Sequence, residues 1–261
     1  MVQTNQAQRS IAQFLGAMRQ TTSFAGMIDL SNLTHIAFDA DDTLWAHENV
    51  FVDAKARCVE LLRPYLQPDQ NLEEKLYLFE RKNLKLFGYG VKGFTLSMIE
   101  TAIELSKGKI TGAEIQQIID LAKEMLDHPI HLLDYVPEAI AALQPHFTLL
   151  IITKGDLFAQ EGKIARSGLA EEFEIIEIVS EKDETTYSNL LQRYAIDPAH
   201  FLMMGNSLRS DVLPIVNIGG RALHLPFEFT WHHEAVTETT EEYWEPKSLQ
   251  VAVDAILAAR Q

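Results

Sequence analysis

Residues 34–44 read THIAFDADDTL, a short apolar run that is followed at once by acidic residues. The apolar run at residues 36–38 has the length of a buried strand. It leads into Asp39, and Asp41 and Asp42 come directly after. Carboxylates this close repel one another, and a bound divalent cation would relieve the repulsion. The stretch therefore indicates a strand that ends in a catalytic or metal-binding site, with a solvated acidic turn as the simpler alternative.

Composition limits the classes of protein to which this chain can belong. It has 261 residues, of which 47% are hydrophobic and 23% charged, as in ordinary globular proteins. The formal net charge of −15 argues against nucleic acid or an anionic membrane as a partner. No run of about 18 apolar residues could span a membrane, and residues 1–22 lack the pattern of a signal peptide. The single cysteine, Cys58, fits a reducing compartment, so we expect a cytoplasmic protein of unknown oligomeric state.

Hydrophobic periodicity divides the chain into three parts. Residues 1–30 carry a weak helical pattern and are predicted to form an N-terminal extension. In residues 31–50 and 128–261, continuous apolar strands alternate with helices, which predicts a Rossmann-like α/β core with helices on both faces of a parallel sheet. Residues 51–127 show almost only helical spacing, with a capping box at residues 111–114, and are predicted to form an inserted all-helical cap.

Reactive side chains follow the predicted strands, at the edge where parallel sheets bind ligands. Asp39 can act as a nucleophile that forms an acyl phosphate, and Asp41 can protonate a leaving group and then activate water. Thr153 can donate its hydroxyl to a phosphate oxygen, and Lys182 can neutralise charge. Asp211, together with Asp39, can hold Mg²⁺. These are the residue types that phosphoryl transfer requires.

Four motifs in order resemble those of the haloacid dehalogenase-like (HAD) hydrolase superfamily. The first is FDADDTL at residues 38–44, and the second is an apolar strand that ends in threonine, at residues 149–153. The third is the lysine of SEKD at residues 180–183, and the fourth is MGNSLRSD at residues 204–211. With a helical insertion between the first two, the pattern is similar to that of C1-capped, phosphatase-like members. The resemblance implies the strand order 5-4-1-2-3 and a metal contact from the main-chain carbonyl of Asp41.

Two assignments within these motifs have alternatives. The fourth motif usually begins Gly-Asp, and here the second position is Asn206. We therefore assign the metal carboxylate of this motif to Asp211, and expect Asn206 to contribute an amide oxygen or to bind a metal-bound water. Lys154 and Lys163 are rivals of Lys182 in the third motif. Lys154 directly follows the second motif and Lys163 falls in the middle of a predicted helix, where we expect a surface lysine, so both fit less well.

Residues 88–94, GYGVKGF, interrupt the helices of the cap with three glycines. We predict a cap loop that reaches the active site, where Lys92 and Phe94 select the substrate; a plain turn between helices is the alternative. On the core side, substrate contacts are assigned to Thr43, Lys154 and Gly155.

The sequence as a whole predicts a Mg²⁺-dependent phosphatase that acts on small phosphorylated metabolites through an aspartyl-phosphate intermediate. One alternative is a 2-haloacid dehalogenase, but those enzymes need no metal and lack the second acid of the first motif, here Asp41. Another is a phosphonatase or phosphomutase; a phosphonatase would need a Schiff-base lysine in the cap, for which Lys55 and Lys92 are candidates. A non-catalytic HAD-like binding protein would have lost motif acids, and Asn206 is the one hint of such a loss.

Overall fold

The computed structural model describes residues 29–67, 70–227 and 243–260, so the N-terminal extension expected at residues 1–30 lies outside this part of the chain except at its end. Five parallel strands form one sheet in the order β3-β2-β1-β4-β5. The strands are β1 (His35–Phe38), β2 (Thr148–Lys154), β3 (Ile175–Val179), β4 (Phe201–Gly205) and β5 (Arg221–His224). The sheet and its strand order confirm the prediction.

The central strand places the acidic stretch between its two neighbours. In β1, Phe38 pairs with Ile151 of β2 and with Met204 of β4. The next residue, Asp39, donates its main-chain N–H to the carbonyl of Met204 at 2.9 Å. The carboxyl ends of β1, β2 and β4 therefore meet at one edge of the sheet, where side chains from all three can converge.

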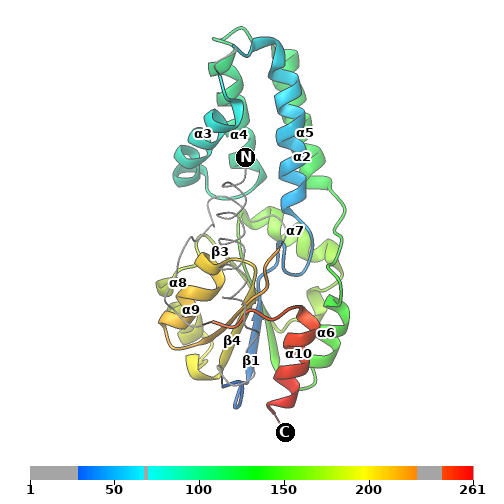
Figure 1. The fold of residues 1–261 in the computed structure, drawn as a ribbon, viewed down its shortest axis with the longest axis vertical. Coiled ribbons are helices and arrows are strands. Elements are labelled where there is room, and N and C mark those ends of the chain that lie inside the picture. Colours follow the sequence, from blue (N-terminus) through cyan, green and yellow to red (C-terminus); the bar gives the residue numbers. More distant parts are fainter. Residues whose placement is uncertain (1–28, 68–69, 228–242, 261) are drawn as a thin grey trace, which may run out of the picture.

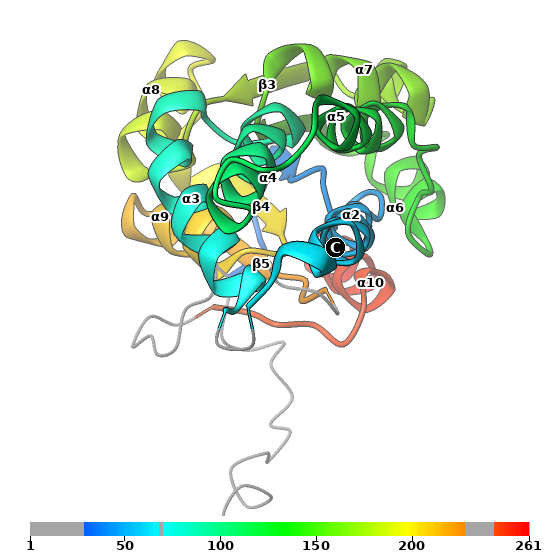
Figure 2. The same ribbon diagram turned by 90° about the horizontal axis from the view of Figure 1, so that it is seen from above.

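Helices cover both faces of the sheet, because alternate residues of each buried strand point to opposite sides. Ile36 and Phe38 of β1 belong to a hydrophobic cluster with α6 (Val136–Leu143), α7 (Leu157–Ser167) and α10 (Leu249–Ala258). Ala37 belongs to the cluster on the other face, with α8 (Glu184–Arg193) and α9 (Leu213–Asn217). Figure 1 shows these helices around the sheet, and Figure 2 shows α8 and α9 on the side opposite to α6 and α10.

A second, helical layer lies beyond the carboxyl ends of the strands (Figure 1). Its helices are α2 (Glu48–Leu62), α3 (Leu72–Phe87), α4 (Val91–Leu105) and α5 (Gly112–Asp127). They enclose a hydrophobic cluster of their own, in which Cys58 and Met98 are fully buried. The predicted capping box is present, since Thr111 N–H donates to Glu114 Oε2 at 2.7 Å and Glu114 N–H donates to Thr111 Oγ1 at 3.3 Å. We call this layer the cap; it begins at Glu48, ahead of the boundary at residue 51 that the periodicity indicates.

Short helical turns complete the described part of the chain. They are η2 (Arg63–Tyr65), η3 (Ala170–Glu172), η4 (Pro198–His200) and the π-helical turn η5 (Leu208–Val212). No helix in the described ranges combines the length and the apolar character needed to cross a membrane.

Candidate active site

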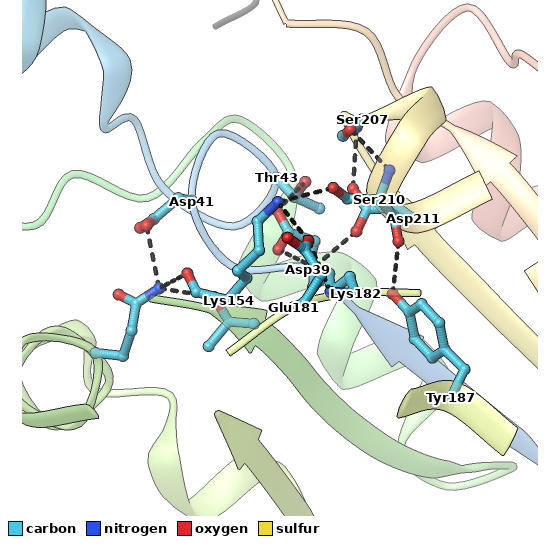
Figure 3. A network of polar contacts seen from close by, with 12 residues as sticks. Asp39, Asp41, Thr43, Lys154, Glu181, Lys182, Tyr187, Ser207, Ser210 and Asp211 are labelled. Atoms are coloured by element: carbon cyan, nitrogen blue, oxygen red, sulfur yellow. Dashed lines mark hydrogen bonds and ion pairs between the residues drawn. The ribbon is translucent and has the colours of Figure 1, made fainter. Parts of the chain in front are cut away.

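Asp39 lies at the bottom of the site, directly after β1, and only 7% of its surface is exposed. The Thr43 hydroxyl donates to its Oδ2 at 3.3 Å. The ammonium of Lys182, from the loop after β3, contacts its Oδ1. Lys182 also donates to Asp211 Oδ1 at 2.6 Å, so one ammonium joins the carboxylates of the first and fourth motifs (Figure 3). Three of the predicted site residues thus meet, although they lie far apart in the sequence.

Asp211 is held by the backbone of its own motif. Ser207 N–H donates to Asp211 Oδ2 at 3.0 Å, and Asp211 N–H donates to the carbonyl of Ser207 at 2.8 Å. The side chain folds back onto Gly205 at the end of β4, where a Cβ atom would lie 2.3 Å from Asp211 Cγ. Only glycine leaves room for this carboxylate at the strand end.

The electrostatics of this cluster follow from its burial. Burial is the main cause that raises the pKa of Asp39 to about 7; the charge of Lys182 opposes it, and the carboxylates of Asp211 and Asp41 add to it. Burial would lower the pKa of Lys182, but the carboxylates of Asp211 and Asp39 outweigh it and raise the pKa above its ordinary value. Lys182 is therefore a permanent cation, and the two carboxylates around it form a site that favours positive charge.

The donor set fits Mg²⁺. Asp39 and Asp211 both contact the Lys182 ammonium, and Asn206 lines the cavity that contains them. The main-chain carbonyl of Asn206 accepts a hydrogen bond from His224 Nε2 at 3.0 Å, which fixes this part of the loop after β4. The described residues contain no group of three or more His, Cys, Asp or Glu side chains that could hold a metal. Magnesium is usually bound by one or two carboxylates, with water and substrate phosphate completing the octahedron, so an Asp39–Asp211 pair is sufficient.

Asp41 is held by side chains that sequence reasoning did not assign. Trp45 Nε1–H donates to its Oδ1 at 2.8 Å. From α7, Lys163 Nζ lies 2.7 Å from Oδ1 and 2.5 Å from Oδ2, and Gln160 Nε2 donates to Oδ2 at 3.2 Å. Lys163 is only 8% exposed, so the expectation of a surface lysine is wrong. The mid-helix position of Lys163 does not imply exposure, because α7 packs its inner face against the acidic loop.

Lys163 is also the cation that keeps Asp41 ionised. Burial would raise the pKa of the Asp41 carboxyl, but His47, in its protonated form at acid pH, and the Lys163 ammonium outweigh it and hold the pKa below its usual range. Burial lowers the pKa of His47 to about 4, so its imidazole is neutral at pH 7. Its Nε2 accepts from Lys163 Nζ at 3.1 Å. An ionised Asp41 is the form that can accept a proton.

The third carboxylate of the acidic stretch begins the cap. Asp42 has a φ of 60°, a left-handed conformation that aspartate adopts more readily than most residues. Its Oδ1 accepts the N–H groups of His47 at 2.7 Å and Glu48 at 3.1 Å. These N–H groups belong to the start of α2, where a carboxylate satisfies free donors and the helix dipole. Asp42 therefore connects the active-site loop to the first cap helix.

The second motif also lines the site. Thr153 is 1% exposed, and its hydroxyl oxygen accepts from Gln160 Nε2 at 2.8 Å. Lys154 Nζ donates to Ser210 Oγ at 2.9 Å and to Glu181 Oε1 at 3.3 Å. Both residues, and the following glycine at position 155, line the same cavity as Asp39.

A cavity of about 200 Å³ lies between the cap and the core. The core contributes Asp39, Asp41 and Lys182 to its wall, and the cap contributes Phe94. Further cap residues in the wall are Glu48, Phe51, Glu80, Leu84, Tyr89 and Val91. The Phe94 ring lies 5.1 Å from that of Phe51, in an edge-on arrangement. The wall of the cavity thus joins charged groups of the core to a cap side that is mostly apolar but includes the carboxyl groups of Glu48 and Glu80.

The segment at residues 88–94 connects the two layers directly, but it is not a loop throughout: residues 88–90 form a turn, and residues 91–94 are the first turn of α4. Tyr89 Oη donates to Glu181 Oε2 at 2.7 Å, and the Lys154 ammonium lies 4.1 Å from the centre of the Tyr89 ring. Lys92 does not belong to the residues that line the cavity; its side chain is exposed, and its ammonium lies 2.9 Å from Asp156 Oδ1 of the core. The segment therefore reaches the site with Tyr89 of the turn and Phe94 of α4, while Lys92 of α4 forms a cap–core ion pair.

Trp45, His47, Gln160 and Lys163 are the site residues that sequence analysis missed. One signal was available for two of them: Gln160 and Lys163 lie three positions apart in a helix that follows the second motif, so they share one face. Nothing in the sequence shows which way that face points.

Comparisons with known proteins extend this picture. The family model for haloacid dehalogenase-like hydrolases matches residues 33–219. A haloacid dehalogenase-like family hydrolase from Xanthomonas campestris is 41% identical, with a TM-score of 0.77 over 87% of this chain and 92% of that chain. A HAD-hydrolase from Bacillus subtilis, solved with bound magnesium, is 16% identical, with a TM-score of 0.57 over 86% and 99% of the two chains. A 2-haloacid dehalogenase from Pseudomonas syringae is 22% identical, with a TM-score of 0.57 over 87% and 98%. No curated protein shows significant similarity.

The family model covers most of the chain and includes all four motifs. The Xanthomonas structure agrees with it at a level of identity where fold and family go together. The other two structures share the fold alone. The chain therefore belongs to the family of haloacid dehalogenase-like hydrolases.

Proposed function

We propose that this hydrolase is a Mg²⁺-dependent phosphatase that acts on small phosphorylated metabolites through an aspartyl-phosphate intermediate. The observation that carries the proposal is that Asp39 and Asp211 both contact the Lys182 ammonium. The second acid, Asp41, lines the same cavity. A nucleophile, a proton-transfer group and a pair of oxygen ligands are what phosphoryl transfer needs. A cytoplasmic location remains a prediction from the single cysteine, Cys58.

In the first half of the reaction, a carboxylate oxygen of Asp39 forms a bond to phosphorus as the bond to the leaving oxygen breaks. Asp41 is ionised in the free site, so it takes a proton from the monoanion of the bound phosphate ester and passes it to that oxygen. In the second half, Asp41 takes a proton from water, whose oxygen bonds to phosphorus as the bond to Asp39 breaks. Lys182 and the Thr153 hydroxyl hold the phosphoryl oxygens in both halves. A bound Mg²⁺, held by Asp39, Asp211 and the Asp41 carbonyl, would supply charge neutralisation for those oxygens.

A 2-haloacid dehalogenase is the main alternative within the family, since such enzymes share the fold. In that reaction Asp39 would attack a carbon atom and release halide. Halide needs neither a proton nor a metal to leave, whereas this site holds a second acid, Asp41, which is partly exposed and ion-paired with Lys163, and a buried Asp211. A second acid and a carboxylate that can share a metal ion with Asp39 fit phosphoryl transfer, which favours the phosphatase.

One experiment separates the two reactions. The purified chain is assayed for release of an aryl alcohol from an aryl phosphate, and for halide release from 2-chloropropionate, each with Mg²⁺ and with a chelator. We expect Mg²⁺-dependent hydrolysis of the phosphate, lost in Asp39→Asn and kept in Asp254→Asn, which changes an exposed aspartate of α10. Halide release that persists in the chelator, without phosphate hydrolysis, would establish the dehalogenase instead.

A further inference from the structure

Helix α7 approaches Asp41 with two buried side chains. Gln160 is 2% exposed and Lys163 is 8% exposed. They project from one face of the helix and both reach the same carboxylate, across more than a hundred residues of sequence. Burying a lysine and a glutamine under an active-site loop is costly unless both are well partnered. Their placement therefore calls for a functional reason.

Gln160 links Asp41 to the second motif. Its Nε2 lies 2.8 Å from Thr153 Oγ1, 3.2 Å from Asp41 Oδ2 and 3.0 Å from the carbonyl of Lys154. An amide nitrogen carries two hydrogens, so these three acceptors share them. Its Oε1 is buried, and no group in the described part of the chain hydrogen-bonds to it. The amide is thus oriented for its nitrogen contacts at the expense of its oxygen.

The loop after β2 is shaped around this side chain. Gly155 has a φ of +153°, and a Cβ atom at this position would lie 3.2 Å from both Cγ and Nε2 of Gln160. Because Gly155 has no side chain, Gln160 can lie flat against the loop that follows Thr153. Lys163, one turn further along α7, holds both oxygens of Asp41 at 2.7 and 2.5 Å.

We propose that Gln160 and Lys163 are positioning residues that fix the Asp41 carboxylate relative to Thr153, so that the proton-transfer group stands at a set distance from the bound phosphoryl group. The inference rests on the proposed function. Lys163 fixes both carboxylate oxygens, and Gln160 sets their distance from the hydroxyl that contacts phosphate. Proton transfer by Asp41 depends strongly on the position of its carboxylate. Attack by Asp39 on an ester with a good leaving group does not depend on that position, because such a leaving group hardly needs a proton.

The test compares Gln160→Leu and Lys163→Met with Glu161→Gln, a change at an exposed position of the same helix. Each full-length variant is assayed with Mg²⁺ on a 4-nitrophenyl ester and on an alkyl phosphate. The alkyl leaving group needs a proton and the nitrophenyl group hardly does. In each variant we expect kcat on the alkyl ester to fall by a factor that is on the order of tenfold or more larger than the factor by which the rate of the 4-nitrophenol burst falls. KM should change little. Lys163→Arg, which keeps a cation on the same face, should recover part of the loss.

The outcomes separate this inference from the proposed function. Equal falls in kcat on the alkyl ester and in the burst rate on the aryl ester, or no fall in either, in an otherwise active enzyme would overturn the inference alone. Equal losses are what a merely structural role of the two residues predicts, because a weakened fold affects all substrates alike. Wild-type protein that hydrolyses neither ester would overturn both the function and the inference.

Discussion

The ammonium of Lys182 lies 2.6 Å from Oδ1 of Asp211, and neither side chain is more than 2% exposed. This contact joins the third motif to the fourth, and the same ammonium reaches Asp39 of the first. A single buried cation thus holds the two carboxylates that otherwise repel each other.

Removing this cation should cost most of the activity. Lys182→Ala leaves two buried carboxylates unpaired and removes positive charge from the phosphoryl oxygens, so we expect kcat/KM on an aryl phosphate to fall on the order of 10²-fold or more. Lys123→Ala, which changes an exposed lysine of α5, is the control and should leave the rate unchanged. Similar rates in the two variants would show that Lys182 is not the lysine of the third motif. Lys163, expected from sequence to be a surface residue, is unsuitable as a control because it is buried against Asp41.

Gly205→Ala tests the position of Asp211 without changing any charge. The added methyl group would lie 2.3 Å from Asp211 Cγ, so the Asp211 carboxylate must shift from its present position. We expect a weaker dependence of the rate on Mg²⁺, seen as a higher metal concentration at half-maximal activity, together with a lower kcat. Gly112→Ala in the first turn of α5, where no atom lies within 4 Å of the added methyl group, should be neutral or slightly stabilising. An unchanged Mg²⁺ titration in Gly205→Ala would contradict the role of Asp211 as a metal ligand.

Asp41→Asn should separate the two halves of the proposed reaction. An activated aryl leaving group hardly needs a proton, so the first half should survive, while water attack loses its base. We expect one burst of aryl alcohol per enzyme, followed by a stalled phosphoenzyme that is visible as added mass after acid quench. Slow steady turnover, without a burst and without added mass, would mean that Asp41 only positions other groups.

The cap should influence the choice of substrate through Phe94 rather than through Lys92. Phe94 lines the cavity and packs edge-on against Phe51, whereas Lys92 is exposed and pairs with Asp156. Phe94→Ala should therefore change relative kcat/KM across a panel of phosphate monoesters with large and small leaving groups. Lys92→Ala should change all rates by a similar factor, because an exposed ion pair between cap and core contributes only about 1 kcal/mol or less. A substrate profile that changes with Lys92 and not with Phe94 would reverse this assignment.

Much of the site could be predicted from sequence because its key residues lie at or after the ends of the strands of a parallel sheet. The run from Ile36 to Phe38 forms the central strand, and the spacing of Asp39 and Asp41 places both acids in the loop that follows it. In a parallel sheet every strand ends at the same edge, so Thr153 and Asp211, which follow other strands, must come close to Asp39. The strand order was implied by the family resemblance alone, because the order of motifs along a chain does not fix which strands are neighbours in the sheet.

What the sequence specified about this protein, then, is what short-range spacing encodes: the strands, the cap helices with the capping box at Thr111, and the edge at which the acids meet. The contacts of Gln160 and Lys163 with the Asp41 carboxylate could be found only from the tertiary structure. Lys163 lies 122 residues away in the sequence, and its contact depends on how α7 rotates and packs against the acidic loop. Hydrophobic spacing shows which face of a helix is buried, but it does not show which loop that face meets, because burial is non-directional while an ion pair needs defined geometry.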